Sequence, residues 1–459
     1  MSIDNSYIRI VKNIRNPSPN VRKGFCIQTT DVKYLQFIFF VLVGVQIVIA
    51  RESADTLLTV RTIVIEGNLT TKDYVILREM KLQPGELITH ASLDHDEKRI
   101  YSLGLFNKVE LDVKPEGKEA VVVVQVDERW YIFPYPIIGI RYRDFNKLYY
   151  GAGFVHTNFR GRNEKLYLSA ALGFDRWVVM TYRNPRLTDD DLSLGVEARY
   201  SEIQSLSVET DVYDQTNLKL GLELGKRFDL YNSVLGWVNY DVWNISEPGL
   251  GRTVSPDGRD AFVSVGAGVS VNTSDVREYP IDGYSFVFGA SKHGFGESPV
   301  NFFRYGFDAR GYAPVYDGIS LAGRAFSSFV GGGKIPKYHR AYFGYRERIR
   351  GYFKDAREGE HIAGGSAEVR IPLISPRHYT LPFEFIKEFS TFRYGLYLGV
   401  FADAGTVWYR GQNVFDQRWY SGYGAGLHFL LPYSLVLRTE YALNMEGRGE
   451  FVLDVGASF

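Results

Sequence analysis

Leu218-Lys-Leu-Gly-Leu-Glu-Leu-Gly225 alternates leucine with a charged or small residue at every position. The same period of two recurs in Val263-Ser-Val-Gly-Ala-Gly-Val-Ser-Val271 and, at the end of the chain, in Glu450-Phe-Val-Leu-Asp-Val-Gly-Ala-Ser-Phe459. Successive side chains of a β-strand point to opposite faces, so each segment predicts a strand with one apolar and one polar face. Similar segments, separated by breaks rich in Asn, Asp, Gly, Pro and Arg, continue from about residue 129 onward.

This alternation fits two kinds of fold. A soluble sandwich buries the apolar face, whereas a membrane barrel turns it to lipid and lines its lumen with the polar face. The barrel is favoured by an N-terminal export signal, by the lack of a second helical layer, by an aromatic content of 15% and by Phe459 on the apolar face. We therefore predict a mainly β fold class, a transmembrane antiparallel β-barrel over residues 129–459 with about 16 strands, at about 20 residues for each strand and its loop.

The N-terminal segment has the pattern of a secretory signal. An uncharged stretch over residues 34–50 follows the basic residues Arg22, Lys23 and Lys33 and ends in Val48 and Ala50, where small residues precede a cleavage point. We predict a signal peptide with a long leader over residues 1–50 and a linker over residues 51–58. A signal anchor kept in the inner membrane is the alternative, because the stretch is near the shortest length that spans a bilayer.

Charge and cysteine content limit the function classes. The chain has 53 basic and 53 acidic side chains, so no global electrostatic attraction favours nucleic acid as a partner. Its one cysteine, Cys26, precedes the uncharged stretch, which leaves the exported part without a disulfide framework.

A small α/β domain is predicted over residues 59–128. Its first strand is Thr59-Val-Arg-Thr-Ile-Val-Ile-Glu66, rich in β-branched residues. Thr70 or Thr71 caps a helix that runs to about Met80, and a second helix opens near Ser92. Two strands follow, over residues 106–114 and 120–127, and give the order β-α-α-β-β.

Two phrases of this domain, Val64-Ile-Glu-Gly-Asn68 and Leu103-Gly-Leu-Phe-Asn-Lys-Val109, resemble a POTRA domain, the polypeptide-transport-associated module of the BamA/TamA superfamily. The resemblance implies a module that offers its sheet edges to client chains and partner subunits. Those bacterial assembly proteins usually carry several such domains, so a single one favours a short accessory relative.

The barrel region resembles the same superfamily in five sequence segments. They are Tyr182-Arg-Asn-Pro-Arg-Leu187, Thr273-Ser-Asp-Val-Arg-Glu-Tyr-Pro-Ile-Asp-Gly-Tyr284, Arg348-Ile-Arg-Gly-Tyr352, Gly365-Ser-Ala-Glu-Val-Arg-Ile-Pro-Leu373 and Phe401-Ala-Asp-Ala-Gly405. The third matches the family's (Val/Ile)-Arg-Gly-(Phe/Tyr) motif on the long sixth extracellular loop, and the fifth matches its Phe-x-Asp-x-Gly motif on a late strand. Their order and spacing agree with the family along nearly the whole chain from Thr59.

Alternation also predicts a contact inside the barrel. If Leu398 and Val400 face lipid, then Asp403 faces the lumen, where a lone carboxylate needs a cationic partner. Arg350 is the candidate, because a guanidinium binds a carboxylate through two parallel hydrogen bonds, and Gly351 allows a close approach to the wall. The predicted site residues are the loop motif Ile349, Arg350, Gly351 and Tyr352, the wall residues Phe401, Asp403, Gly405 and Glu368, and the terminal-strand residues Phe451, Leu453, Val455 and Phe459.

No enzyme motif accompanies these features. The sequence has no G-x-S-x-G, H-E-x-x-H, Walker A or paired C-x-x-C pattern, and its eight histidines are scattered. We therefore predict no catalysis, no cofactor and no metal site.

The resemblance implies a factor that assembles, inserts or translocates proteins at the outer membrane of a Gram-negative-type bacterium, with the POTRA domain in the periplasm. Its partners would be outer-membrane lipids, unfolded client polypeptides and accessory periplasmic or lipoprotein subunits. A first strand over about residues 131–142 and a last strand over residues 451–459 would part to template client strands. Two other functions stay open, a secretion or passive pore and, as a third class, a barrel enzyme acting on lipid.

Overall fold

The structure is a computed structural model that describes residues 58–141, 145–205, 212–246, 251–316, 318–344, 347–353, 355–381 and 387–456. The predicted signal peptide over residues 1–50, the predicted linker except residue 58, and Phe459 lie outside these described residues. Within the described part of the chain, no helix combines the length and the apolar character that a membrane span needs.

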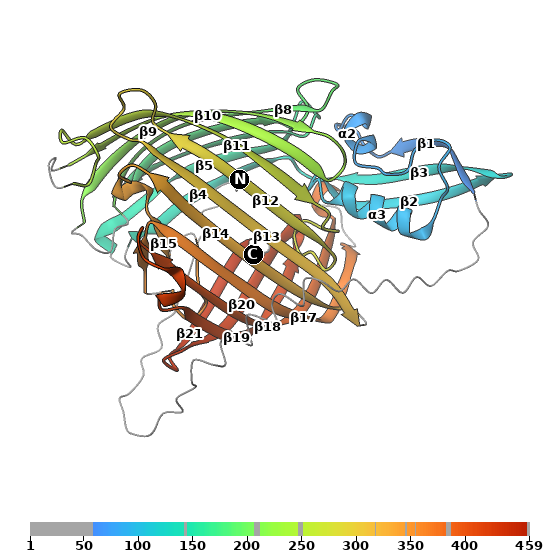
Figure 1. Ribbon diagram of the computed structural model, residues 1–459. Helices are drawn as coiled ribbons and strands as arrows, with labels where there is room; N and C mark the ends of the chain where they lie inside the picture. Colours follow the sequence, from blue (N-terminus) through green and yellow to red (C-terminus); the bar gives the residue numbers. More distant parts are fainter. Residues whose placement is uncertain are drawn as a thin grey trace.

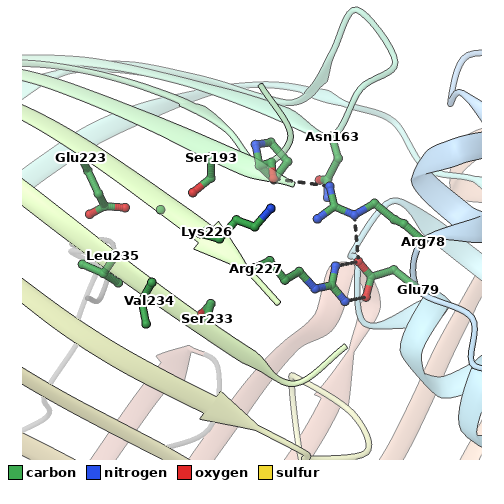
Figure 2. A pocket seen from close by; sticks show the side chains of 12 residues that line it. Arg78, Glu79, Asn163, Ser193, Glu223, Lys226, Arg227, Ser233, Val234 and Leu235 are labelled. Atoms are coloured by element: carbon green, nitrogen blue, oxygen red, sulfur yellow. Dashed lines mark hydrogen bonds and ion pairs between the residues drawn. The ribbon is translucent and has the colours of Figure 1, made fainter. Parts of the chain in front are cut away.

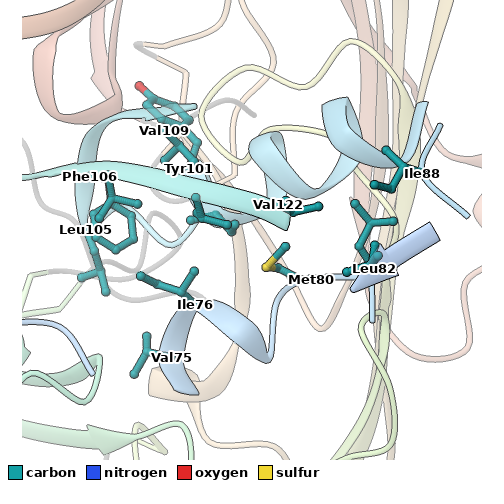
Figure 3. Close-up of a cluster of buried hydrophobic side chains, with 14 of the residues drawn as sticks. Val75, Ile76, Met80, Leu82, Ile88, Tyr101, Leu105, Phe106, Val109 and Val122 are labelled. Carbon is teal, nitrogen blue, oxygen red and sulfur yellow. The ribbon is translucent and has the colours of Figure 1, made fainter. Parts of the chain in front are cut away.

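The N-terminal domain packs two helices against a three-stranded sheet with strand order β1-β3-β2. Its elements are β1 (Thr59–Glu66), α2 (Asp73–Leu77), α3 (His90–Tyr101), β2 (Phe106–Glu116) and β3 (Glu119–Glu128). The order is the one predicted. Val75 and Ile76 of α2 meet Leu105 and Phe106 in a buried core between helices and sheet (Figure 3).

The starts of the two helices differ from the prediction. Helix α3 is capped by Thr89, whose side chain accepts from the amide of Ser92 at 3.0 Å. Helix α2 begins after Lys72, without a side-chain cap, and the amides of Thr70 and Thr71, which precede the helix, donate to the Glu128 carboxylate at the end of the domain's last strand. The predicted cap by Thr70 or Thr71 is therefore wrong, and these two residues instead tie the segment before α2 to the end of β3.

The rest of the chain forms a 16-stranded antiparallel sheet that curls into a barrel, and the predicted fold is confirmed (Figure 1). Its strands are β4 (Ile132–Ile140), β5 (Leu148–Phe159), β6 (Glu164–Gly173), β7 (Arg176–Asn184), β8 (Leu192–Gln204), β9 (Asp214–Arg227), β10 (Asn232–Ile245), β11 (Arg259–Asn272), β12 (Gly283–His293), β13 (Phe302–Tyr316), β14 (Ile319–Gly332), β17 (His361–Thr380), β18 (Thr391–Trp408), β19 (Tyr420–Leu431), β20 (Leu435–Asn444) and β21 (Gly449–Gly456). Short 3-10 helices lie in the connections: η2 (Phe145–Lys147), η3 (Lys337–His339), η4 (Lys387–Phe389), η5 (Val414–Asp416) and η6 (Pro432–Ser434).

The apolar faces of the strands point out of the barrel. In β9, Leu222 and Leu224 are 46% and 53% exposed. In β11, Val263 and Val265 are 39% and 42% exposed, whereas Ser264 between them is 1% exposed. An exposed apolar exterior around a polar interior is the pattern of a membrane barrel.

The first and last strands, β4 and β21, are the two ends of this sheet. The described residues of β4 pair with β5, and those of β21 pair with β20, but none of them pairs β4 with β21. Two prolines, Pro134 and Pro136, stand in β4, where each removes a backbone donor. The barrel wall therefore has a seam between its terminal strands.

The N-terminal domain covers one end of the barrel, which we call the near end (Figure 1). Its side chains reach successive strand connections there, and the pairs are Arg78–Asp191, Glu79–Arg227, His95–Tyr231, Ser102–Asp275, Asn107–Glu388 and Arg129–Ser434. Val276, from the connection between β11 and β12, is 4% exposed and belongs to the hydrophobic core of the domain. Domain and barrel are thus joined by both polar contacts and shared core packing.

Candidate functional site

A long connection between β14 and β17 enters the barrel from the end opposite the domain, the far end. It carries a small two-stranded sheet, β15 (Ala341–Phe343) and β16 (Arg357–Gly359). Between these strands, Ile349 and Tyr352 are 3% and 4% exposed and pack in a cluster with Phe326, Phe343 and Ile362. Apolar anchors on both sides of Arg350 therefore hold the tip of this connection inside the lumen.

Arg350 binds Asp403 through a planar two-point contact. Its Nε donates to Asp403 Oδ2 at 2.7 Å and its Nη2 to Oδ1 at 2.7 Å, and the Arg350 amide adds a third bond at 3.0 Å. Strand β18 turns Asp403 inward by alternation, since Val400 is 45% exposed and Asp403 is 4% exposed. The structure thus brings together the arginine and the carboxylate that the sequence selects.

Two further carboxylates surround the same guanidinium. Nη1 of Arg350 lies 3.1 Å from Glu368 Oε2 and 2.9 Å from Glu440 Oε1. The Phe401 ring lies below the guanidinium, with its centroid 3.5 Å from Cζ. Burial alone would lower the pKa of Arg350, but the charge of Asp403 raises it above its ordinary value, so this arginine stays a cation.

Two glycines allow the tip to approach the wall. Gly351 has φ +93°, a conformation that favours glycine, and a Cβ there would lie 3.2 Å from the Asn444 amide nitrogen. A Cβ on Gly422 of β19 would lie 1.8 Å from the carbonyl oxygen of Arg350. Tyr352 extends the contact by donating to Glu446 at 2.8 Å. The tip is therefore fitted against β19, β20 and the turn that follows β20.

Gly405, the last residue of the Phe-x-Asp-x-Gly motif, has a steric role. A Cβ at this position would lie 2.4 Å from the ring of Phe343, which is 3% exposed. The motif thus supplies a ring under the guanidinium, a carboxylate beside it, and room for the small sheet of the long connection.

Glu440 and His428 were missed by the sequence analysis. Both are on lumenal positions of β19 and β20, and His428 Nε2 lies 3.1 Å from Glu440 Oε1. His428 also contacts the Tyr279 hydroxyl at 2.8 Å. Alternation could have placed each of them in the lumen, but it could not have shown which lumenal residue of a distant strand lies opposite.

The donor atoms of Glu368, His428 and Glu440 lie within 4.8 Å of one another, a spacing that a metal ion could bridge. Guanidinium groups already take these oxygens, because Arg350 contacts both glutamates and Arg370 binds Glu368 at 2.8 Å. Cations compensate the carboxylates, so this cluster is built as an ion-pair network and does not fit a metal.

The terminal-strand residues lie apart from this cluster. Phe451 of β21 is 52% exposed and pairs with Tyr441, which is 55% exposed. Leu453 and Val455 of β21 pair with Thr439 and Leu437 of β20. β21 is the strand that borders the seam. Phe459 is outside the described residues.

These features define a transmembrane β-barrel with an attached small α/β domain. A family model for the Omp85 superfamily domain matches residues 158–459, and a model for POTRA, described as surface antigen variable number repeat, matches residues 58–129. The chain therefore belongs to the Omp85 superfamily, and the predicted membership of the BamA/TamA group is confirmed. The N-terminal domain is called the POTRA domain below.

Two relatives are named outer membrane protein assembly factor BamA. The protein of Nitratidesulfovibrio vulgaris is 24% identical over 323 residues, and that of Neorickettsia risticii is 26% identical over 419 residues. The alignments cover 66% and 86% of this chain but only 40% and 54% of the relatives. The chain thus spans about half the length of these relatives or less.

Solved structures share the fold. BamA from Haemophilus ducreyi lacking POTRA domains 1–3 matches with a TM-score of 0.52 and 20% identity, over 87% of this chain and 83% of that one. CdiB from Escherichia coli matches with a TM-score of 0.51 and 9% identity, over 95% and 98% of the two chains.

Proposed function

We propose that this protein assembles or translocates polypeptides at the outer membrane and that it does so without catalysing a reaction. Assembly is the role that the names of its relatives give for those proteins. The seam between β4 and β21 is the observation that carries the proposal. Unpaired strand edges in an otherwise continuous wall can accept the backbone of another strand. Clients would be unfolded outer-membrane or secreted polypeptides.

The seam strands suit such an exchange. β4 has 9 residues, whereas β17 and β18 have 20 and 18 residues. The prolines of β4 limit the number of hydrogen bonds that a closed seam could form. A short, donor-poor edge costs less to open, and the exposed Phe451 and Tyr441 keep β21 anchored to the apolar phase during opening.

The POTRA domain would lie in the periplasm and receive clients or accessory subunits. Its sheet order leaves β1 and β2 as edge strands, each able to pair with an incoming strand. With this orientation, the connection that carries Arg350 enters from the outside of the cell. The Arg350 cluster would hold that connection in the lumen while the seam opens.

A secretion or passive pore is the second candidate. The half-buried, polar and charged lumenal faces of β8 and β9, such as Glu197 and Lys219, are compatible with a water-filled path. A passive pore would conduct ions at all times, whereas an assembly factor whose lumen holds the long connection would conduct little at rest.

Reconstitution into liposomes separates these candidates. Liposomes with the protein receive a urea-denatured barrel client, and insertion is read from heat-modifiable migration of the client on a gel, beside ion conductance. A peptide that copies β21 (Gly449–Gly456) should inhibit insertion by occupying the edge of β4, and a scrambled peptide is the matched control. Conductance without insertion would assign the protein to the pore class.

A further inference from the structure

Two cations stand directly opposite each other at the near end of the barrel. Lys165 of β6 pairs in register with Arg183 of β7. Both lie on the lumenal face, because Leu168 and Met180, at the other parity of the same strands, are 49% and 53% exposed on the outside. Like charges at paired positions destabilise a sheet, so this arrangement calls for a compensating anion.

A third cation joins them from across the lumen. Arg277 lies in the connection between β11 and β12, where its neighbour Val276 enters the POTRA core and its amide donates to Ser102 at 3.2 Å. The charges of Arg277 and Arg183 both act on the Lys165 ammonium. Arg277 is exposed, whereas its neighbours Val276 and Glu278 are buried. We call Lys165, Arg183 and Arg277 the near-end cation cluster.

The nearby carboxylates neutralise this cluster only in part. Glu223 forms a long ion pair with Arg183 at 3.9 Å, and Glu278, next to Arg277 in the chain, binds Arg393 at 2.5 Å. Among the described residues, the side chains of Lys165 and Arg277 form no hydrogen bond or ion pair. Here like charges lie at paired positions of a sheet without full compensation by carboxylates. Sites in proteins that depart in this way from a general rule of stability are often functional.

The cluster adjoins a cavity that opens between the POTRA domain and the barrel. This cavity has a volume of about 260 Å³ and is lined by Glu223, Ser193 and Asn163 on the barrel side. Figure 2 shows Arg227 and Glu79 joined at its domain side, with Glu223 and Ser193 on the opposite side. A ligand from the periplasm could therefore reach the cations without crossing lipid.

Beyond the cations, the lumenal wall of β4 to β7 is aromatic. The rings of Tyr135 and Tyr167 stack with centroids 6.4 Å apart, and those of Tyr149 and Trp177 meet at 5.2 Å. A Cβ on Gly153 would lie 2.1 Å from the Tyr135 ring, so this ring rests flat on the wall. A cationic entrance followed by a lumenal wall of aromatic rings suits an extended segment that carries carboxylates beside apolar side chains.

We propose that the near-end cation cluster is an anion-binding site that captures the carboxylates of an extended client polypeptide as it enters the lumen beneath the POTRA domain. The inference rests on the proposed function and names the class of segment recognised. A phosphate-bearing lipid offers a similar anion and is distinguished by competition in the test below, whereas a polypeptide has the cavity at the near end as a path from the periplasm.

The test measures binding of short labelled peptides to the purified full-length protein in detergent, by fluorescence anisotropy at low salt. One peptide alternates apolar residues with serine and carries two aspartates near one end, and its matched forms carry asparagine or lysine there. The aspartate peptide should bind most tightly, with an advantage that falls with rising salt.

Three variants distinguish the site from general attraction. In the double variant Lys165→Gln/Arg277→Gln, the aspartate peptide should lose about tenfold in affinity, on the scale of two partly exposed ion pairs. The matched control Arg61→Gln/Lys118→Gln removes one arginine and one lysine from the exposed POTRA surface and should change nothing. Arg277→Glu should favour the lysine peptide, a reversal that misfolding cannot produce, and heat-modifiable migration verifies the fold of each variant.

The outcomes separate this inference from the proposed function. Equal binding of the three peptides, or a charge preference that survives the double variant, would overturn the inference even if client insertion proceeds. Charge-selective binding without insertion would count against the assembly function alone. Phosphatidylglycerol and inorganic phosphate serve as competitors of the labelled aspartate peptide. If the lipid displaces the labelled peptide at a lower concentration than unlabelled aspartate peptide does, the site binds lipid headgroups and the inference of a polypeptide ligand is overturned.

Discussion

Glu79 of the POTRA domain and Arg227 of β9 form a two-point ion pair across the junction between domain and barrel, with Nη1 to Oε1 at 2.6 Å and Nη2 to Oε2 at 3.0 Å (Figure 2). Arg99 donates to the same carboxylate at 2.9 Å. The Glu79 side chain is 9% exposed, so a neutral replacement would leave two arginines short of their anion.

Glu79→Gln should therefore loosen the POTRA domain from the barrel. The expected cost is about 1–3 kcal/mol, on the scale of a buried charged hydrogen bond. Hydrogen exchange should quicken in α2 and in the connection after Arg227, while the middle of the barrel strands stays protected. Glu110→Gln is the matched control, because Glu110 lies on the exposed face of β2 and its ion pair within the described part of the chain is with Lys108. Unchanged exchange in both variants would show that other contacts hold the domain.

Arg350→Ala should leave three carboxylates without their shared cation. We expect a loss of a few kcal/mol, reduced by water in the lumen, with easier protease cleavage near Tyr352. Arg350→Lys should rescue only partly, because an ammonium lacks the planar fork that binds both oxygens of Asp403. A double-mutant cycle on melting temperature with Asp403→Ala measures the coupling, and effects that simply add would mean that the two residues are not energetic partners.

Gly422→Ala should separate the loop tip from β19. The new methyl group would sit 1.8 Å from the Arg350 carbonyl oxygen, so the tip or the strand must shift. Overpacking of this kind costs about 1–3 kcal/mol. The melting temperature should fall and protease access at the tip should rise. Gly311→Ala in β13, where a Cβ meets nothing within 4 Å, is the control and should melt like the unmodified protein.

Deleting residues 59–127 should leave a heat-modifiable barrel that no longer handles clients, because most of the domain core lies within the deleted part. The truncated barrel should melt at a lower temperature, since Val276 and the near-end connections lose their cover. Insertion of a denatured client at the full rate by the truncated protein would place the activity in the barrel alone.

Alternation predicted the strands and the lumenal position of Asp403, because a strand repeats every two residues whatever lies around it. The choice of a membrane barrel also needed the export signal, the aromatic content and the lack of a helical layer, and the strand number came from the length of the segment. The contact between Arg350 and Asp403 could be predicted because a buried carboxylate needs a cation and the family motifs supplied one. The roles of Glu440 and His428 and the contact between Glu79 and Arg227 could not be predicted. Each of these contacts depends on which residues of distant strands and domains face one another. Periodicity describes a single strand and carries no information about contacts between elements that are far apart in the sequence.

Val276 places one apolar side chain of the barrel inside the core of the POTRA domain. The domain is made first on the chain, yet the residue that completes its core follows only after β11 has been made. Its final packing must therefore wait for a barrel connection to form, and the early domain would present an open apolar notch until then. Folding of this protein would thus follow an order in which the core of the POTRA domain completes its packing last. A fully packed core would then mean that the near end of the barrel has already formed.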